Sequence, residues 1–223
     1  MNLFKEYSRR LAVCILGLAL FGFGNMLGVK AGLAGTNAWN TLALGLSESL
    51  GFSFGTGTLL ISLLIIAIDL LGRGKLGLGT VLNLLLIPFF SDLFLAIPGF
   101  LPEAGGMIAG ALYTLAGQMV LSFATIFYMS PALGCGPRDT LMILIGKKFP
   151  KAPIGTVKFC MELCALALGV LLGAPFGLGT ILVMLLQAAI FQLVCRVLHY
   201  EPRSVSHEDL PDTLRRLFPR LSK

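Results

Sequence analysis

Six long apolar runs, with almost no charge inside them, decide what kind of fold this chain can adopt. They cover residues 11–29, 56–72, 79–98, 107–130, 154–172 and 178–198. A helix needs about 20 apolar residues to cross the hydrocarbon core of a bilayer, which is about 30 Å thick. The runs are continuous, as in "TLLISLLIIAIDLL", whereas the strands of an outer-membrane barrel alternate polar and apolar residues. We therefore predict an all-α, polytopic membrane protein with about six transmembrane helices.

The composition indicates a membrane protein, and the cysteines and histidines argue against a metal or redox site. Of the 223 residues, 56% are hydrophobic and only 13% are charged, which is typical of a membrane protein. The five cysteines form no CxxC pair, and both histidines lie in the polar C-terminal tail. We interpret the cysteines as small helix-packing residues, and we expect no metal site and no cofactor.

The basic residues are distributed asymmetrically around the runs, which explains the net charge of +6 without a nucleic-acid partner. If the amino terminus is cytoplasmic, nearly all of them fall on the inner side: Lys5, Arg9, Arg10, Arg73, Lys75, Arg138, Lys147, Lys148, Lys151 and the basic residues of the tail. Lys30 falls outside and Lys158 falls within a span, in agreement with the positive-inside rule. We predict a multi-pass membrane protein with both termini cytoplasmic.

The two ends of the chain need separate interpretation. The start "MNLFKEYSRRLAVCILGLALFGFG" is similar to a signal peptide, but no small-x-small cleavage site follows and glycine-rich sequence continues the span. We interpret it as a retained first helix. Residues 199–223 form a charged tail, which is either a surface-lying helix around "LPDTLRRLFPRL" or a solvated segment.

Three sequence matches in the same order indicate an internal repeat. "AGTNAWNTL" at 34–42 matches "LGCGPRDTL" at 133–141, at an offset of 99 residues. "FGTGT" at 54–58 matches "IGTVK" at 154–158, and "GLGTVLNLLL" at 77–86 matches "GLGTILVMLL" at 177–186, both at an offset of 100. Each half contains three spans, so the second half is expected to be inserted upside down relative to the first. We predict inverted repeats at residues 1–103 and 104–198, followed by the tail at 199–223.

Each half also contains one short segment between its first and second spans. "KAGLAGTNAWNTLALGLSESLGF" and "SPALGCGPRDTLMILIGKKFPK" each begin with glycines and then carry residues typical of a helix start: Thr36 with Asn37, and Gly136 with Pro137. We predict two helices of about 10 to 12 residues, roughly half a hydrocarbon core in length. Two placements are open: re-entrant helices whose amino-terminal ends lie deep, or interfacial helices that lie flat.

The re-entrant placement predicts a binding site where the two helix starts converge. Helix amino termini carry unpaired N–H groups and a partial positive charge, which suit an anionic or strongly polar group. The candidate substrate-binding residues are Thr36, Asn37, Trp39 and Asn40 from the first half and Arg138 and Asp139 from the second. We expect Arg138 to provide charge and hydrogen bonds, and Asp139 to hold Arg138 or relay a proton. In the flat placement, these two residues form a surface capping pair.

A second group of candidates consists of polar residues inside the spans: Asp69, Asn83, Asp92, Lys158 and Glu162. Such residues are costly in lipid and are candidate coupling or proton sites. Lys158 and Glu162 are four residues apart, so they can pair along one helix face. That pair is either structural or part of a coupling relay. Asp69 and Asp92 are candidate proton sites, or they lie near span ends and meet water.

The motifs "AGTNAWNTL", "GLGTVLN" with "FFSDL", and "GCGPRDTLM" together resemble the bacterial YczE/YyaS/YitT-type membrane-protein family, particularly its YczE-like branch. The resemblance covers nearly the whole membrane region, and the GPRD stretch is its most specific element. Asn40 stands where the resemblance leads us to expect an acid. What the resemblance implies is location in the inner membrane and topology, more than a substrate.

The predicted function is a secondary transporter or solute-binding membrane protein for a small polar or anionic solute. The alternative is a substrate-binding or accessory membrane subunit of a larger transport or biosynthetic complex, without autonomous transport. The expected partners are the lipid bilayer and the solute, and a homo-oligomer or a partner membrane protein stays open. "AGLAGTNAWN" has a likeness to the phosphate loop of glycerol acyltransferases, but no HExxH, GxGD or Ser/His set accompanies it. We therefore expect no enzymatic activity.

Overall fold

The computed structural model describes residues 3–201 and 208–217. In this part of the chain, six α-helices are long and apolar enough to cross a membrane. They are α1 (Leu3–Val29), α3 (Phe54–Leu71), α4 (Leu78–Ala96), α5 (Met107–Met129), α7 (Ile154–Leu171) and α8 (Leu178–Val197). Both the all-α fold class and the six predicted spans are thus confirmed.

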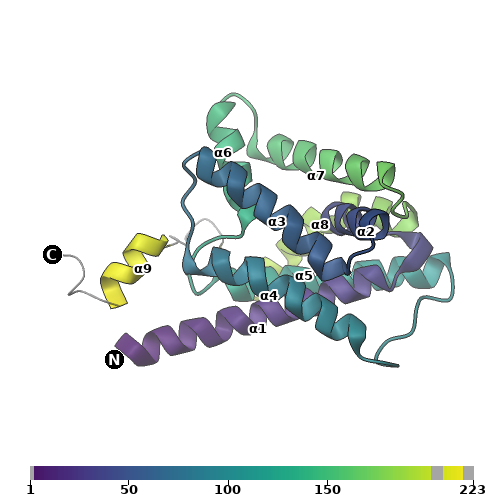
Figure 1. Cartoon of the computed structure of the whole chain (residues 1–223), viewed down its shortest axis with the longest axis horizontal. Helices are drawn as coiled ribbons and strands as arrows, with labels where there is room; N and C mark the ends of the chain where they lie inside the picture. Colours follow the sequence, from purple (N-terminus) through teal and green to yellow (C-terminus); the bar gives the residue numbers. More distant parts are fainter. Residues whose placement is uncertain (1–2, 202–207, 218–223) are drawn as a thin grey trace.

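Two shorter helices follow the first and fourth spans, as predicted: α2 (Ala38–Leu50) and α6 (Pro137–Lys148). Asn37 caps α2, because its side chain accepts a hydrogen bond from the Asn40 backbone N–H at 3.0 Å. Pro137 occupies the first turn of α6 after Gly136. In Figure 1 the long helices run from left to right, α2 is seen nearly end-on and α6 runs across them. Neither short helix therefore runs along the spans.

The helices pack in pairs that repeat between the two halves of the chain. At the centre α1 packs along α5. In addition, α1 packs on α4 as α5 packs on α8, and α2 packs on α7 as α3 packs on α6. Each short helix is therefore held against a span from the other half.

Glycines allow the central helices α1 and α5 to approach closely. A Cβ added to Gly17 would lie 2.5 Å from the backbone nitrogen of Tyr128, and one on Gly117 would lie 2.9 Å from the Gly24 carbonyl oxygen. Inside a bilayer no hydrophobic driving force brings helices together. Small residues at such crossings stabilise the contact instead, because they allow close backbone packing.

The loops that lead into the short helices are fixed by the starts of spans. The Gly79 N–H donates to the Leu133 carbonyl at 2.7 Å, and the Thr80 hydroxyl donates to the Cys135 carbonyl at 2.6 Å. On the other side, Gly35 forms an isolated β-bridge with Phe176. These contacts place the first turns of α2 and α6.

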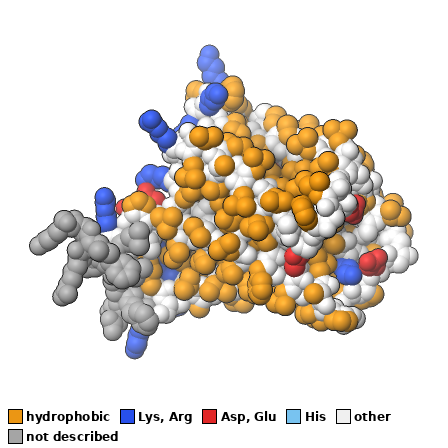
Figure 2. All heavy atoms as spheres, viewed as in Figure 1, with side chains coloured by type: hydrophobic (Ala, Val, Ile, Leu, Met, Phe, Trp, Pro, Cys, Tyr) orange, Lys and Arg blue, Asp and Glu red, His pale blue; other side chains and the backbone are white. Residues whose placement is uncertain are grey.

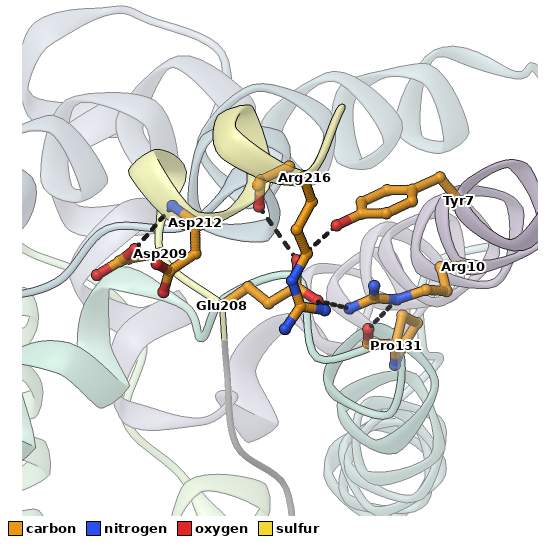
Figure 3. Close-up of polar contacts among 8 residues, drawn as sticks. Tyr7, Arg10, Pro131, Glu208, Asp209, Asp212 and Arg216 are labelled. Atoms are coloured by element: carbon orange, nitrogen blue, oxygen red, sulfur yellow. Dashed lines mark hydrogen bonds and ion pairs between the residues drawn. The ribbon is translucent and has the colours of Figure 1, made fainter. Parts of the chain in front are cut away.

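A C-terminal segment, residues 208–217, folds back onto the membrane helices and contains α9 (Leu210–Leu217). Glu208 is its anchor: its carboxylate accepts a hydrogen bond from the Tyr7 hydroxyl at 2.8 Å and forms ion pairs with Arg10 at 2.8 Å and Arg216 at 2.9 Å (Figure 3). The Glu208 N–H also donates to the Ala132 carbonyl at 2.9 Å. The predicted tail helix thus begins as expected, and the rest of the tail, residues 202–207 and 218–223, lies outside the described residues.

The surface is apolar over most of the face drawn in Figure 2, with Lys and Arg side chains gathered towards the end that carries the amino terminus and α9. Large apolar side chains on the spans are widely exposed, including Leu71 at 87% and Leu64 at 64%. Contiguous apolar surface of this extent matches a protein surrounded by lipid.

Candidate functional site

A cavity with a volume of about 370 Å³ lies where the starts of α2 and α6 meet, a size typical of small-molecule sites. Residues from each of the helices α1 to α8 line it. Its polar and charged lining residues are Asn37, Asn40, Thr58, Ser62, Asn83, Gln118, Ser122, Thr125, Tyr128, Arg138, Asp139, Lys158, Glu162 and Gln187. A protein with an apolar exterior therefore gathers many of its polar side chains around one internal space.

Arg138 and Trp39 join the two short helices across this cavity. The guanidinium carbon of Arg138 lies 4.7 Å from the centroid of the Trp39 ring, which is a cation–π distance. Within the described residues, the Arg138 side chain forms no ion pair or hydrogen bond. Its charged group therefore contacts the face of the Trp39 ring, and its N–H groups donate to no described residue.

Asp139 accepts a hydrogen bond from the fourth span, α5, and forms no ion pair with its neighbour Arg138 among the described residues. The Tyr128 hydroxyl donates to Asp139 Oδ2 at 3.0 Å. Gly136, the residue before α6, makes this approach easier, because a Cβ there would lie 3.1 Å from the Tyr128 hydroxyl. The expectation that Asp139 holds Arg138 is therefore not met in this arrangement.

Lys158 and Glu162 pair along α7, as their spacing predicts. Lys158 Nζ lies 3.8 Å from Glu162 Oε1, and the Gln187 side-chain amide donates to the other carboxylate oxygen. Glu162 is buried and Lys158 is exposed. Both carboxylate oxygens of Glu162 thus have a partner, one from its own helix and one from α8.

Two buried polar groups of the lining have no partner. The side-chain amide nitrogen of Asn40 and the hydroxyl of Thr58 form no hydrogen bond with any described residue. Asn40 is 2% exposed and Thr58 is 3% exposed. Buried polar groups are hydrogen-bonded in the great majority of cases, so these two unsatisfied groups are exceptional among the residues that line the cavity.

The structure brings most of the predicted site residues together. The members that line the cavity are Asn37, Trp39, Asn40, Asn83, Arg138, Asp139, Lys158 and Glu162. Thr36 does not line it, because this side chain is buried beneath the start of α2, where a Cβ on Gly28 would lie 2.3 Å from its hydroxyl oxygen.

The two other predicted acids also lie outside the cavity. Asp92 accepts hydrogen bonds from the Ser53 hydroxyl at 2.6 Å and the Gly55 N–H at 2.7 Å, so it fixes the start of α3. Asp69 is fully buried near the end of α3, and neither of its carboxyl oxygens has a partner among the described residues. Among the lining residues, therefore, the acids are Asp139 and Glu162.

Sequence reasoning missed several lining residues. Gln118 and Gln187 are amides inside spans, so their polarity is a signal that could have placed them in the site. Thr58 carries no such signal, because threonine hydroxyls in helices can bond to their own backbone, and Tyr128 carries none because its ring is compatible with an apolar span. Their position follows only from how the helices pack.

Comparisons with known proteins agree with this membrane architecture. Residues 8–196 match the family described as "Family of unknown function (DUF6198)". The chain is 31% identical to an "Uncharacterized protein" of Haemophilus influenzae over 181 residues, 81% of each chain. It is also 31% identical to "Uncharacterized membrane protein YczE" of Bacillus subtilis over 190 residues, 84% of this chain and 86% of the relative.

A third relative is more distant. "Uncharacterized protein YyaS" of Bacillus subtilis is 24% identical over 172 residues, which cover 77% of this chain and 85% of the relative. No solved structure matches the chain. The predicted resemblance is confirmed: the chain is similar to "Uncharacterized membrane protein YczE", and it belongs to the family of unknown function DUF6198.

Proposed function

We propose that this protein is a secondary transporter, or a solute-binding membrane protein, for a small polar or anionic solute. The observation that carries the proposal is the meeting of the first turns of α2 and α6 at a cavity lined from all eight helices α1 to α8. Discontinuous or short helices whose amino termini converge in the interior are the usual way in which transporters hold a solute.

Repeated contacts support an inverted-repeat architecture with halves at residues 1–103 and 104–198. Ala104, the residue that follows the first half, donates its N–H to the Lys30 carbonyl at 2.9 Å, in the loop before α2. Glu208, in the tail that follows the second half, donates its N–H to the Ala132 carbonyl at the same distance, in the loop before α6. In both cases a segment that follows the last span of a half returns to the loop before its short helix.

The same arrangement supplies a mechanism of alternating access. Because each short helix packs on a span of the other half, a rocking of one half against the other changes which side of the cavity is covered. Arg138 and Asn40 come from different halves, so a solute bound to both would couple to that movement.

The charge distribution supports an orientation with both termini in the cytoplasm of a bacterial inner membrane. The end that carries the amino terminus, α9 and the end of α6 is rich in Lys and Arg (Figure 2), and the positive-inside rule assigns such an end to the cytoplasm.

The test is solute access to the cavity from both sides of a membrane. Thr125 lines the cavity, so Thr125→Cys, in a chain whose five native cysteines are replaced by alanine, reports on access. We expect an impermeant maleimide to label this cysteine in both right-side-out and inside-out vesicles. Labelling from one side only, together with no solute flux in proteoliposomes, would contradict a function as a transporter. The function as a solute-binding protein or an accessory membrane subunit would then be favoured.

A further inference from the structure

The chemistry of the cavity wall defines the ligand more narrowly than the proposed function does. We infer that the site binds a singly charged carboxylate whose apolar body packs against the apolar part of the wall. This inference rests on the proposed function, because it names the solute class of the same cavity.

The unused groups of the wall are hydrogen-bond donors. Among the described residues, the guanidinium of Arg138 has no hydrogen-bond partner, and neither has the amide nitrogen of Asn40 or the hydroxyl of Thr58. Guanidinium and amide nitrogens only donate, and a hydroxyl does both. A ligand that satisfies all three must present acceptor oxygens, as a carboxylate does.

The acidic groups of the wall are already engaged, which disfavours a cationic ligand. Asp139 accepts from the Tyr128 hydroxyl. Glu162 accepts from Gln187 and lies within ion-pair distance of Lys158. These carboxylates can accept further hydrogen bonds, but Arg138 is the charged side chain of the wall with no hydrogen bond or ion pair among the described residues, which favours an anion.

The pairing of the basic side chains in the wall matches one negative charge on the ligand. The lining contains two basic side chains, Arg138 and Lys158, and two acidic ones, Asp139 and Glu162. Lys158 is already paired with Glu162, so Arg138 is the basic group left for a ligand in this lining. A phosphate monoester carries about 1.5 to 2 negative charges at pH 7, and its second charge would meet no free cation here.

The rest of the wall is apolar and favours a ligand with an apolar body. Besides Trp39, it includes Phe21, Ile87, Leu121, Met142, Met161 and Phe191. A small hydrated anion would leave this surface uncovered, whereas a compact alkyl or aryl group would bury it. Thioether side chains such as those of Met142 and Met161 adapt to ligands of different shape.

The experiment compares probes of nearly equal size with the purified full chain in detergent. Benzoate, butanoate and hexanoate represent singly charged carboxylates, benzamide is the neutral probe, benzylammonium the cation and phenyl phosphate the dianion. Binding is measured by isothermal titration calorimetry and by the shift in melting temperature. We expect at least one carboxylate to bind about tenfold more tightly than the other three classes, which corresponds to about 1.4 kcal/mol.

Three variants test whether the carboxylate binds within the cavity. Asn40→Asp has nearly the same shape but replaces a donor with a negative charge, so it should weaken carboxylate binding by more than about tenfold. Thr58→Val should weaken it a few-fold and leave the melting temperature of the free protein unchanged, because its hydroxyl has no partner in the described structure. Arg138→Gln should abolish binding, and Arg196→Gln, at an exposed arginine near the end of α8, is the matched control.

The possible results separate the inference from the proposed function. Binding of benzamide, benzylammonium or phenyl phosphate that equals or exceeds that of the carboxylates would overturn the inference of a carboxylate ligand. The same conclusion would follow if no carboxylate bound, or if carboxylate binding were unchanged in Asn40→Asp. The proposed function would survive each of these results if the chain moved another solute across proteoliposomes. It would fail if the Thr125→Cys probe and the flux assay were both negative.

Discussion

Arg138 lies over the indole ring of Trp39, with 4.7 Å between the guanidinium carbon and the ring centroid. These residues belong to the first turns of α6 and α2, which come from different halves and are separated in sequence by the three helices α3, α4 and α5. The contact therefore joins the starts of the two short helices across the cavity.

A double-mutant cycle measures this contact. Trp39→Leu and Arg138→Gln should each reduce the free energy of unfolding, and their coupling energy should be about 0.5–2 kcal/mol, the range for a cation–π pair from exposed to desolvated sites. The measurement is denaturant unfolding of the purified protein in detergent. A coupling energy near zero would show that the two side chains do not stabilise each other.

The two acids of the first half should respond oppositely to the same substitution. Asp69 is fully buried without a partner for either oxygen in the described structure, so Asp69→Asn should keep or raise the melting temperature. Asp92 accepts two hydrogen bonds at the start of α3, so Asp92→Asn should cost about 1–3 kcal/mol. Thermal unfolding of both variants at one pH checks this, and a loss of stability in Asp69→Asn larger than that in Asp92→Asn would contradict it.

The close approach of α1 and α5 should make Gly17 intolerant of any side chain. Gly17→Ala places a methyl group 2.5 Å from backbone atoms of α5, so we expect a loss of about 1–3 kcal/mol from overpacking. Gly155→Ala in α7 is the matched control, because a Cβ there meets nothing within 4 Å. The control should be neutral or slightly stabilising, since alanine favours a helix over glycine. Similar melting temperatures for the two variants would argue against close packing at Gly17.

The contacts of Glu208 predict that the attachment of the C-terminal segment, residues 208–217, depends on pH. Burial acts to raise the pKa of Glu208, but the hydrogen bonds from Tyr7 and Arg10 and the charges of Arg10 and Arg216 outweigh it and lower the pKa below the usual 4.5. A lowered carboxyl pKa stabilises the folded state above the usual value, and this stabilisation is lost as the pH falls through the folded-state pKa. We therefore expect the C-terminal segment to stay in place at neutral pH and to detach only below about 4.5.

The Cys135 thiol is a reporter of that detachment, because Glu208 holds the Ala132 carbonyl in the same loop. Burial raises the pKa of the Cys135 thiol, so its reaction with a maleimide should be slow at neutral pH. In a chain with Cys135 as its one cysteine, Glu208→Gln should increase the labelling rate on the order of tenfold, as expected for the loss of one charged hydrogen bond. Asp212→Asn in the same segment is the control, and equal rates in all three proteins would rule out this coupling.

The spans and the short helices could be predicted from the sequence because their signals are local. A run such as 178–198 contains the length and apolarity of α8, and Asn37 before an apolar stretch is a helix cap wherever it occurs. Matching the two halves also led to Asn40 and Arg138 as members of one site, since both follow equivalent glycine-rich loops.

The remaining features depend on packing between distant segments. Asp69 and Asp92 look alike in the sequence, as single acids near the ends of spans, yet Asp92 has two donors beside it and Asp69 has none in the described structure. The Tyr7–Glu208 contact joins residues 201 positions apart, and no local pattern marks it.

The anchoring of Glu208 has a consequence for biosynthesis. Tyr7 and Arg10 belong to α1, which a ribosome delivers to the membrane before the other five spans of the described structure, and Glu208 is made only after all six of these spans. Until then Arg10 lacks its carboxylate, so the contact can form only when all the spans have been synthesised. A fusion or truncation that removes residues 208–217 should therefore leave the spans able to insert but the loop before α6 without its support.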